Sequence, residues 1–72
     1  MVIVYTSFGW GPCMATKSWL KKNNIDYIEK NVSQEGVAEE IFSLGYRSTP
    51  VIVTEKETIV GFNPTKLSKA LL

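Results

Sequence analysis

The order of the first predicted segments constrains the fold of this chain more than any other feature. Val2–Tyr5 is a continuous run of β-branched and aromatic residues, which is typical of a central strand covered on both faces. A loop follows, a helix is predicted from about Cys13 to Lys22, and Ile25–Val32 is predicted to be a second strand. A strand-helix-strand unit of this length predicts two parallel strands joined by a right-handed crossover.

Local signals mark the ends of the two helices predicted in this first half. Pro12 suits the first turn of a helix, and Asn23-Asn24 end that helix because Asn tolerates the left-handed conformation found there. A second helix is predicted with Ser33 as its N-cap and Glu35 in its first turn. Gly45 is expected to end it. The apolar stripe at helical spacing between these signals consists of Val37, Ala38, Ile41, Phe42 and Leu44.

The last third of the chain follows a different pattern. Val51–Val53 and Thr58–Val60 are short apolar segments separated by a polar connection of hairpin length. Asn63-Pro64 is an N-cap followed by proline at the first helical position, and it predicts a third helix. The complete order βαβαββα predicts an α/β fold with a four-stranded mixed sheet flanked by helices. No linker or repeat interrupts it, so residues 1–72 are expected to form a single domain.

Composition narrows the classes of site and partner. The chain has one cysteine and no histidine, so it cannot form an internal disulfide and a metal site is not expected. Its formal net charge of +1 gives no electrostatic case for binding nucleic acid or an anionic membrane. The apolar first segment lacks a preceding positive region and is far too short to span a bilayer. With a lone thiol, a reducing cytoplasmic setting is expected.

The loop between the first strand and the first helix contains Trp10-Gly11-Pro12-Cys13. This segment differs by one residue from a C-x-x-C redox motif, and the residue that is missing is the first cysteine. Cys13 is the only cysteine of the chain. Any redox chemistry of the loop must therefore be explained with a single thiol.

Four segments in order resemble the thioredoxin superfamily and, within it, the small glutaredoxin-like NrdH redoxins. They are Val4-Tyr5-Thr6 before the loop, Ala15-Thr16-Lys17 on the first helix, Gly45–Val51, and Gly61-Phe62-Asn63-Pro64. The resemblance covers nearly the whole chain and implies a thioredoxin-like fold. It also implies an electron carrier that needs no cofactor, is reduced by thioredoxin reductase and supplies electrons to ribonucleotide reductase.

Glutathione is disfavoured as a partner by the same comparison of motifs. Glutathione-using glutaredoxins carry a lysine just before the redox loop and a Gly-Gly-x-Asp-Asp run near the last helix. The corresponding stretches here are Tyr5-Thr6-Ser7 and Gly61-Phe62-Asn63-Pro64-Thr65, which provide neither the lysine nor the acidic pair.

The resemblance also implies a set of partner-binding residues. A cis-proline opens the third strand in this family, so Pro50 would be cis and the backbone of Thr49 would be free to pair with an extended partner segment. An ordinary trans bond is the alternative. The remaining residues of the expected partner site are Gly11, Pro12, Arg47, Ser48, Gly61 and Phe62. Arg47 could instead be a solvated loop charge and Phe62 a satellite core contact.

The substitution at position 10 changes what this chemistry can be. In the family a first thiolate attacks the substrate disulfide and a second resolves the mixed disulfide. Counting back three from Cys13 places Trp10 at the attacking position and Cys13 at the resolving one, so dithiol activity is expected to be lost or strongly impaired. Trp10 could be a substitution in a working redoxin, or a natural feature of a redox-inactive binding module. It could also be an aromatic lid over Pro12, Cys13 and Pro50. Cys13 could be a small buried hydrophobe or a monothiol that reacts on its own.

Overall fold

The computed structural model describes all the residues of the chain, 1–72. The elements in chain order are β1 (Val2–Thr6), α1 (Gly11–Lys22), β2 (Tyr27–Asn31), α2 (Val37–Ser43), β3 (Val51–Val53), β4 (Thr58–Val60) and α3 (Pro64–Leu71). This is the predicted order βαβαββα. None of the helices is long and apolar enough to cross a membrane.

The strands form one sheet in the order β2-β1-β3-β4. β1 pairs in parallel with β2 and antiparallel with β3, and β3 pairs antiparallel with β4, so the sheet is mixed as predicted. β1 occupies a central position, which explains its continuous apolar sequence: Val4 and Tyr5 point to opposite faces and both are buried.

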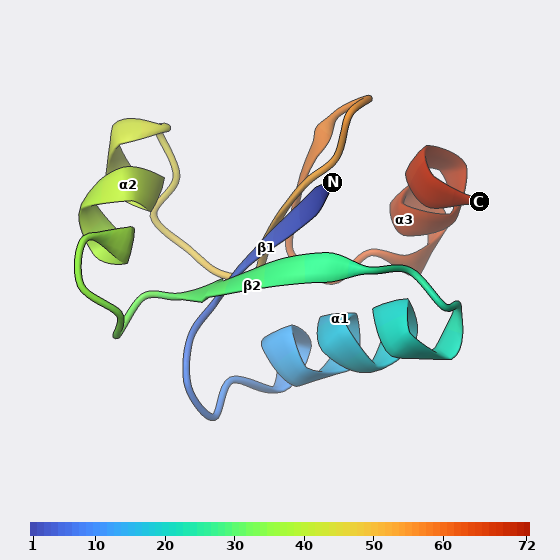
Figure 1. Ribbon diagram of the computed structural model, residues 1–72, viewed down its shortest axis with the longest axis horizontal. Coiled ribbons are helices and arrows are strands. Elements are labelled where there is room, and N and C mark those ends of the chain that lie inside the picture. Colours follow the sequence, from blue (N-terminus) through green and yellow to red (C-terminus); the bar gives the residue numbers. More distant parts are fainter.

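The helices cover the two faces of the sheet unequally (Figure 1). On one face α1 and α3 pack over the main core cluster, which consists of Val2, Val4, Leu20, Ile52, Ile59, Leu67 and Ala70. On the other face α2 packs over a smaller cluster, which consists of Tyr5, Val37, Ile41 and Val51. The carboxyl end of β1 therefore emerges between α1 on one side and α2 on the other.

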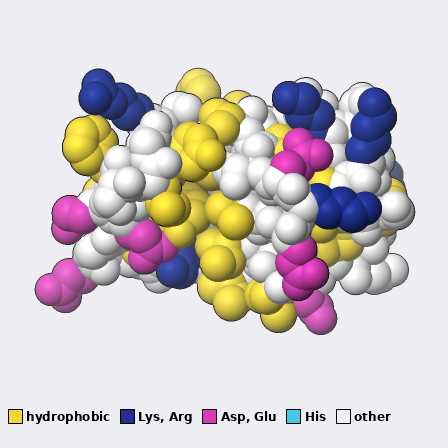
Figure 2. Space-filling view, turned by 90° about the horizontal axis from the view of Figure 1, so that it is seen from above, with side chains coloured by type: hydrophobic (Ala, Val, Ile, Leu, Met, Phe, Trp, Pro, Cys, Tyr) yellow, Lys and Arg dark blue, Asp and Glu magenta, His cyan; other side chains and the backbone are white.

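The short helix α2 leaves part of its own face of the sheet uncovered. Ile28 and Val60, on the edge strands β2 and β4, are 47% and 50% exposed. Ile3 and Val53 on the central strands are only partly buried. Figure 2, seen from above, shows apolar side chains gathered in a band with charged side chains on both flanks.

Two helices end as their local sequence predicts. Asn24 after α1 has φ +57°, and Gly45 after α2 has φ +93°. In both cases the next N–H closes the turn, because Ile25 N donates to the Leu20 carbonyl at 2.9 Å and Tyr46 N donates to that of Ile41 at 3.2 Å. The predicted N-cap of α3 is also confirmed, since the Asn63 side chain accepts a hydrogen bond from the backbone N–H of Lys66 at 3.0 Å.

The predicted start of the second helix at Ser33 is wrong. α2 begins at Val37, and its N-cap is Gly36 with φ +82°. The preceding residues form a turn in which the Asn31 side chain accepts from Ser33 N and the Gln34 side chain accepts from Asn31 N, both at 2.9 Å. These local bonds compete with helix formation, so Ser33 and Glu35 lie before the helix.

The second strand is shorter than predicted. It covers Tyr27–Asn31 rather than Ile25–Val32. Ile25 belongs to the turn that closes α1 and packs against the main core from there. Its apolar side chain is used by the core without the residue joining the sheet, which is why hydrophobicity alone extended the strand too far.

Candidate functional site

The Trp10–Cys13 loop is held at the amino end of α1. Trp10 is the N-cap residue with extended backbone (φ −89°, ψ 119°), and its carbonyl accepts hydrogen bonds from Cys13 N at 3.0 Å and Met14 N at 3.2 Å. Gly11 and Pro12 form the first turn, where the missing N–H of proline costs no hydrogen bond. The backbone on both sides of Cys13 is thus fixed by the helix itself.

Cys13 is a free thiol whose residue is only 1% exposed. Its sulfur accepts a hydrogen bond from the backbone N–H of Ser7 at 3.5 Å. It lines a hollow of about 620 Å³ whose other walls are Ser7, Phe8, Gly9, Met14, Lys17, Glu29, Asn31 and Gln34. Any approach to the sulfur would come through this hollow.

The predicted cis bond between Thr49 and Pro50 is confirmed. Pro50 is buried, and its carbonyl accepts from Gly61 N at 2.9 Å, which continues the pairing of β3 with β4 by one residue. The Thr49 and Ser7 hydroxyls lie 2.7 Å apart and share a hydrogen bond. Ser7 therefore ties the Thr49–Pro50 bond to the end of β1.

The structure brings most of the predicted site residues together in a groove of about 530 Å³ beside Pro50. The groove is lined by Trp10, Gly11, Pro12, Ala15, Thr49, Pro50, Gly61 and Phe62. Seven of these were predicted from sequence, and only Ala15 was not. Cys13 is absent from these walls, so the one thiol of the chain lies at a different hollow from the groove.

The side chain of Trp10 reaches across this groove to the backbone of Thr49. Its indole N–H donates a hydrogen bond to the Thr49 carbonyl at 3.1 Å, although the residue as a whole is 53% exposed. The expectation that the backbone of Thr49 is free for a partner is therefore wrong for its carbonyl. The cause is Trp10 itself, because a cysteine at this position has no donor that reaches so far.

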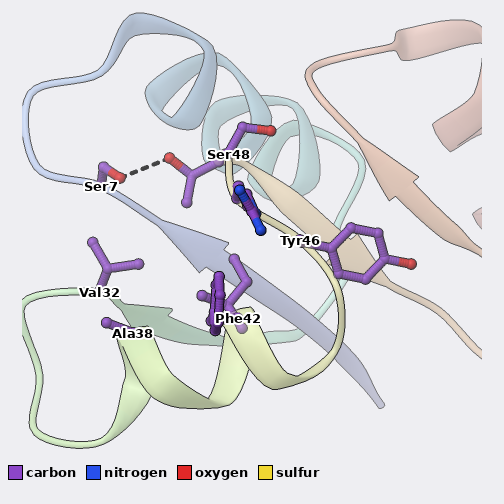
Figure 3. Close-up of a pocket in the computed structure, with 9 residues that line it drawn as sticks. Ser7, Val32, Ala38, Phe42, Tyr46 and Ser48 are labelled. Carbon is purple, nitrogen blue, oxygen red and sulfur yellow. Dashed lines mark hydrogen bonds between the residues drawn. The ribbon is translucent and has the colours of Figure 1, made fainter.

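Arg47 and Ser48 lie on the far side of Thr49, in a third hollow of about 320 Å³. Figure 3 shows this hollow with Ser7 on one wall and Val32, Ala38 and Phe42 on another. The Arg47 guanidinium lies 5.2 Å from the centre of the Phe42 ring, and both residues are exposed. Arg47 thus has an aromatic contact but no carboxylate partner, and it does not line the groove.

One carboxylate near the loop, that of Glu29, has a perturbed pKa. Burial raises the pKa of Glu29, but hydrogen bonds from Thr6 at 2.7 Å and Lys17 at 3.1 Å, with the charges of Lys17 and Lys21, outweigh it and lower the pKa below its ordinary value. Glu29 is therefore a carboxylate in the hollow that Cys13 lines.

No group of three His, Cys, Asp or Glu side chains is placed to hold a metal ion.

A second network lies under α2. The Tyr5 hydroxyl donates to the Glu40 carboxylate, which also accepts from Lys30 at 2.8 Å. Burial raises the pKa of Tyr5 to about 12, with the hydrogen bond to Glu40 and its charge adding to the effect. The hydrogen bond from Lys30, followed by that from Tyr5, lowers the pKa of Glu40. The network fixes α2 against β1 and β2.

Sequence comparison assigns this arrangement to a family. The family model described as Glutaredoxin matches residues 2–59, which contain β1 through most of β4 and both the Trp10–Cys13 loop and Pro50. The chain belongs to the glutaredoxin family. The glutaredoxin-like protein NrdH of Lactococcus lactis subsp. cremoris is 31% identical over 70 residues, which cover 96% of this glutaredoxin-family chain and 97% of the relative.

Solved structures agree with this assignment. The crystal structure of a thioredoxin-like protein superposes on this chain with a TM-score of 0.87 at 33% identity, and the match covers 99% of this chain and 100% of the other. The NrdH-redoxin from Escherichia coli gives a TM-score of 0.85 at 26% identity, covering 94% of this chain and 91% of the other. The predicted thioredoxin-like fold and the resemblance to NrdH redoxins are both confirmed.

Ser7 is the residue of this glutaredoxin-family site that sequence reasoning missed. Its backbone N–H contacts the sulfur of Cys13 and its hydroxyl contacts that of Thr49, so one residue links the two halves of the site. The sequence identified Ser7 only as a loop residue, at the end of the Tyr5-Thr6-Ser7 stretch that lacks the lysine of glutathione-using glutaredoxins. Its place directly after a central strand was the available signal, because strand ends point side chains into such sites.

Proposed function

We propose that the chain is an NrdH-like redoxin in which Trp10 has ended dithiol exchange while the partner groove is kept. The proposal rests on one observation: the N-cap position of α1, three residues before Cys13, carries an indole instead of a thiol. By family resemblance the partners of this scaffold are thioredoxin reductase as electron source and ribonucleotide reductase as electron acceptor. A reducing cytoplasmic setting fits the unpaired thiol.

Loss of exchange follows from the chemistry that two thiols perform. A thiolate at the helix start attacks one sulfur of the substrate disulfide, forms a mixed disulfide and releases the other sulfur as a thiolate. The second thiol then attacks the mixed disulfide, which leaves a reduced substrate and an oxidised redoxin. Trp10 cannot begin this sequence, and Cys13 is 1% exposed and outside the groove. The remaining sulfur therefore has no mixed disulfide to resolve.

The groove favours a second candidate, a redox-inactive binding module. Its walls are apolar and backbone-rich and include the cis bond of Pro50 and the exposed ring of Phe62. None of them needs sulfur chemistry to bind an extended segment of another protein. Independent monothiol chemistry at Cys13 has the least support, because the sulfur is covered. Glutathione stays outside the proposal, because the Tyr5-Thr6-Ser7 stretch contains no lysine and no acidic pair follows Gly61.

The decisive experiment restores the missing sulfur. The Trp10→Cys variant should reduce a protein disulfide with thioredoxin reductase and NADPH, whereas the original chain should show only background rates. Trp10→Cys combined with Cys13→Ser is the matched control and should lose turnover, since the mixed disulfide then has no resolving thiol. A folded Trp10→Cys variant without activity would refute the redoxin proposal. The binding-module candidate instead requires partner binding that survives Cys13→Ser alone.

A further inference from the structure

The hydrogen bond between Trp10 and Thr49 joins two segments that lie 39 residues apart. Half of the Trp10 residue is exposed, so water could serve its indole N–H equally well. Instead this single polar atom is directed at a backbone carbonyl on the opposite wall of the groove. The indole thus joins two residues that line the groove, Trp10 and Thr49.

Thr49 has few other backbone or side-chain groups left for a partner. Its carbonyl is taken by Trp10, its hydroxyl is paired with Ser7, and the following residue, Pro50, has no N–H to offer. The Pro50 carbonyl is already bound to Gly61 N. An extended segment that adds to this edge needs both a donor and an acceptor from Thr49, and it must either share the Thr49 carbonyl with the indole or displace the indole from it.

We propose that Trp10 is an autoinhibitory lid on the groove, closed when its indole binds the Thr49 carbonyl and open when an extended peptide replaces it there. The proposal rests on the partner groove of the proposed function and adds a device that controls access to it. The peptide's backbone N–H takes the position of the indole N–H, so one hydrogen bond replaces another.

The lid can open without disturbing the helix. The Trp10 carbonyl holds the first turn of α1 through Cys13 N and Met14 N, and those bonds involve only the backbone. Rotation about the side-chain bonds of Trp10 is therefore sufficient to release Thr49. The cost of opening is the net strength of one neutral hydrogen bond, which corresponds to about a two- to tenfold reduction in peptide affinity.

The first test asks whether the lid is closed in solution. In a Trp19→Phe background Trp10 is the only indole, and its N–H signal can be followed by NMR. Hydrogen exchange of this N–H should be clearly slower in the folded chain than in the same chain unfolded in urea. An exchange rate equal to that of the unfolded chain would overturn the proposal.

The second test asks whether the lid inhibits binding. The probe is the tightest heptapeptide selected from a random displayed library on the Trp10→Phe variant, which keeps an aromatic ring but lacks the donor. This peptide should bind Trp10→Phe about two- to tenfold more tightly than the original chain, and Trp19→Phe, the matched control, should bind like the original chain. On the original chain the peptide should accelerate exchange of the Trp10 N–H.

The outcomes separate the lid from the redoxin proposal. Equal affinity for the original chain and Trp10→Phe, or weaker binding by Trp10→Phe, overturns the lid even if Trp10→Cys proves active with thioredoxin reductase. Failure of every heptapeptide to bind either chain also overturns it, since the lid would then cover nothing. Tighter binding by Trp10→Phe supports the lid even if Trp10→Cys is inactive, in which case only the redoxin proposal fails.

Discussion

The burial of Cys13 was predictable from its position in the sequence, whereas the hydrogen bond of Trp10 was not. Burial of Cys13 follows from its place in the first turn of a helix packed on a sheet, and it is an ordinary property of cysteine. The hydrogen bond of Trp10 could not be predicted, because a half-exposed indole finds its acceptor through the approach of a loop 39 residues away. Thr49 provides that acceptor only because the sheet places β3 beside β1.

Burial of Cys13 leads to a prediction about its reactivity. Iodoacetamide at neutral pH should alkylate Cys13 in the folded chain at least about tenfold more slowly than in the same chain unfolded in urea, because the reagent must wait for local opening. Mass spectrometry of timed aliquots measures both rates. Trp10→Phe should leave the folded rate unchanged, since Cys13 opens on the hollow beside Lys17 and not on the groove. A folded rate equal to the unfolded one would contradict the protection by burial, and only a folded rate above the unfolded one would restore the monothiol hypothesis.

At the scale of elements, boundaries set by one local conformation were predictable. Asn24 and Gly45 each take the left-handed conformation that ends a helix, and Asn63 provides a side-chain acceptor. The start of α2 was not predictable from Ser33, because Asn31 and Gln34 form a competing turn that lasts until Gly36. The sequence contains a helix-start signal at Ser33 and turn-forming residues at Asn31 and Gln34. The turn forms because the side chains of Asn31 and Gln34 bind backbone N–H groups at the end of β2 and just after it.

Gly45 allows a quantitative test at this scale. Gly45→Ala should destabilise the chain by about 1–2 kcal/mol, since φ is +93° and no neighbouring atom lies within 4 Å of the added Cβ, so the cost is purely conformational. Gly11→Ala is the matched control: it also meets open space, but in the first turn of α1, and should be neutral or stabilising by up to about 1 kcal/mol. Urea unfolding followed by circular dichroism measures both. Equal effects of the two variants would contradict the conformational explanation.

At the scale of the whole molecule, the site depends on the order of strands in the sheet. β1 in the middle brings the Trp10–Cys13 loop beside the start of β3, and the resemblance to redoxins made this arrangement predictable. The hydrogen bonds of Ser7 to Cys13 and Thr49 were not predictable, because nothing in the sequence indicates which partner a serine binds. The network of Tyr5, Lys30 and Glu40 was equally unpredictable, because Lys30 lies 10 residues and Tyr5 lies 35 residues from Glu40 in the sequence.

This network makes stability depend on pH at both extremes. An unfolded tyrosine loses its proton near the ordinary pKa of 10.0, whereas Tyr5 in the folded chain keeps its proton until about 12. Between these values the unfolded state binds fewer protons, so the free energy of unfolding should fall as pH rises. On the acid side the pKa of Glu40 lies below its ordinary 4.5, so its contribution is present above that value and is lost as pH falls through the folded pKa.

Urea midpoints measured against pH can assign the alkaline loss to Tyr5. Because other side chains also ionise at alkaline pH, the comparison must be made between variants. Tyr5→Phe should lower stability at neutral pH by about 1 kcal/mol and flatten the decline from pH 10 to 12. Tyr46→Phe, which lies outside the network, should keep the original slope. An unchanged slope in Tyr5→Phe would mean that Tyr5 does not cause the decline. A flattened one would mean that the protonated Tyr5 hydroxyl, through its hydrogen bond to Glu40, contributes to holding α2 on the sheet.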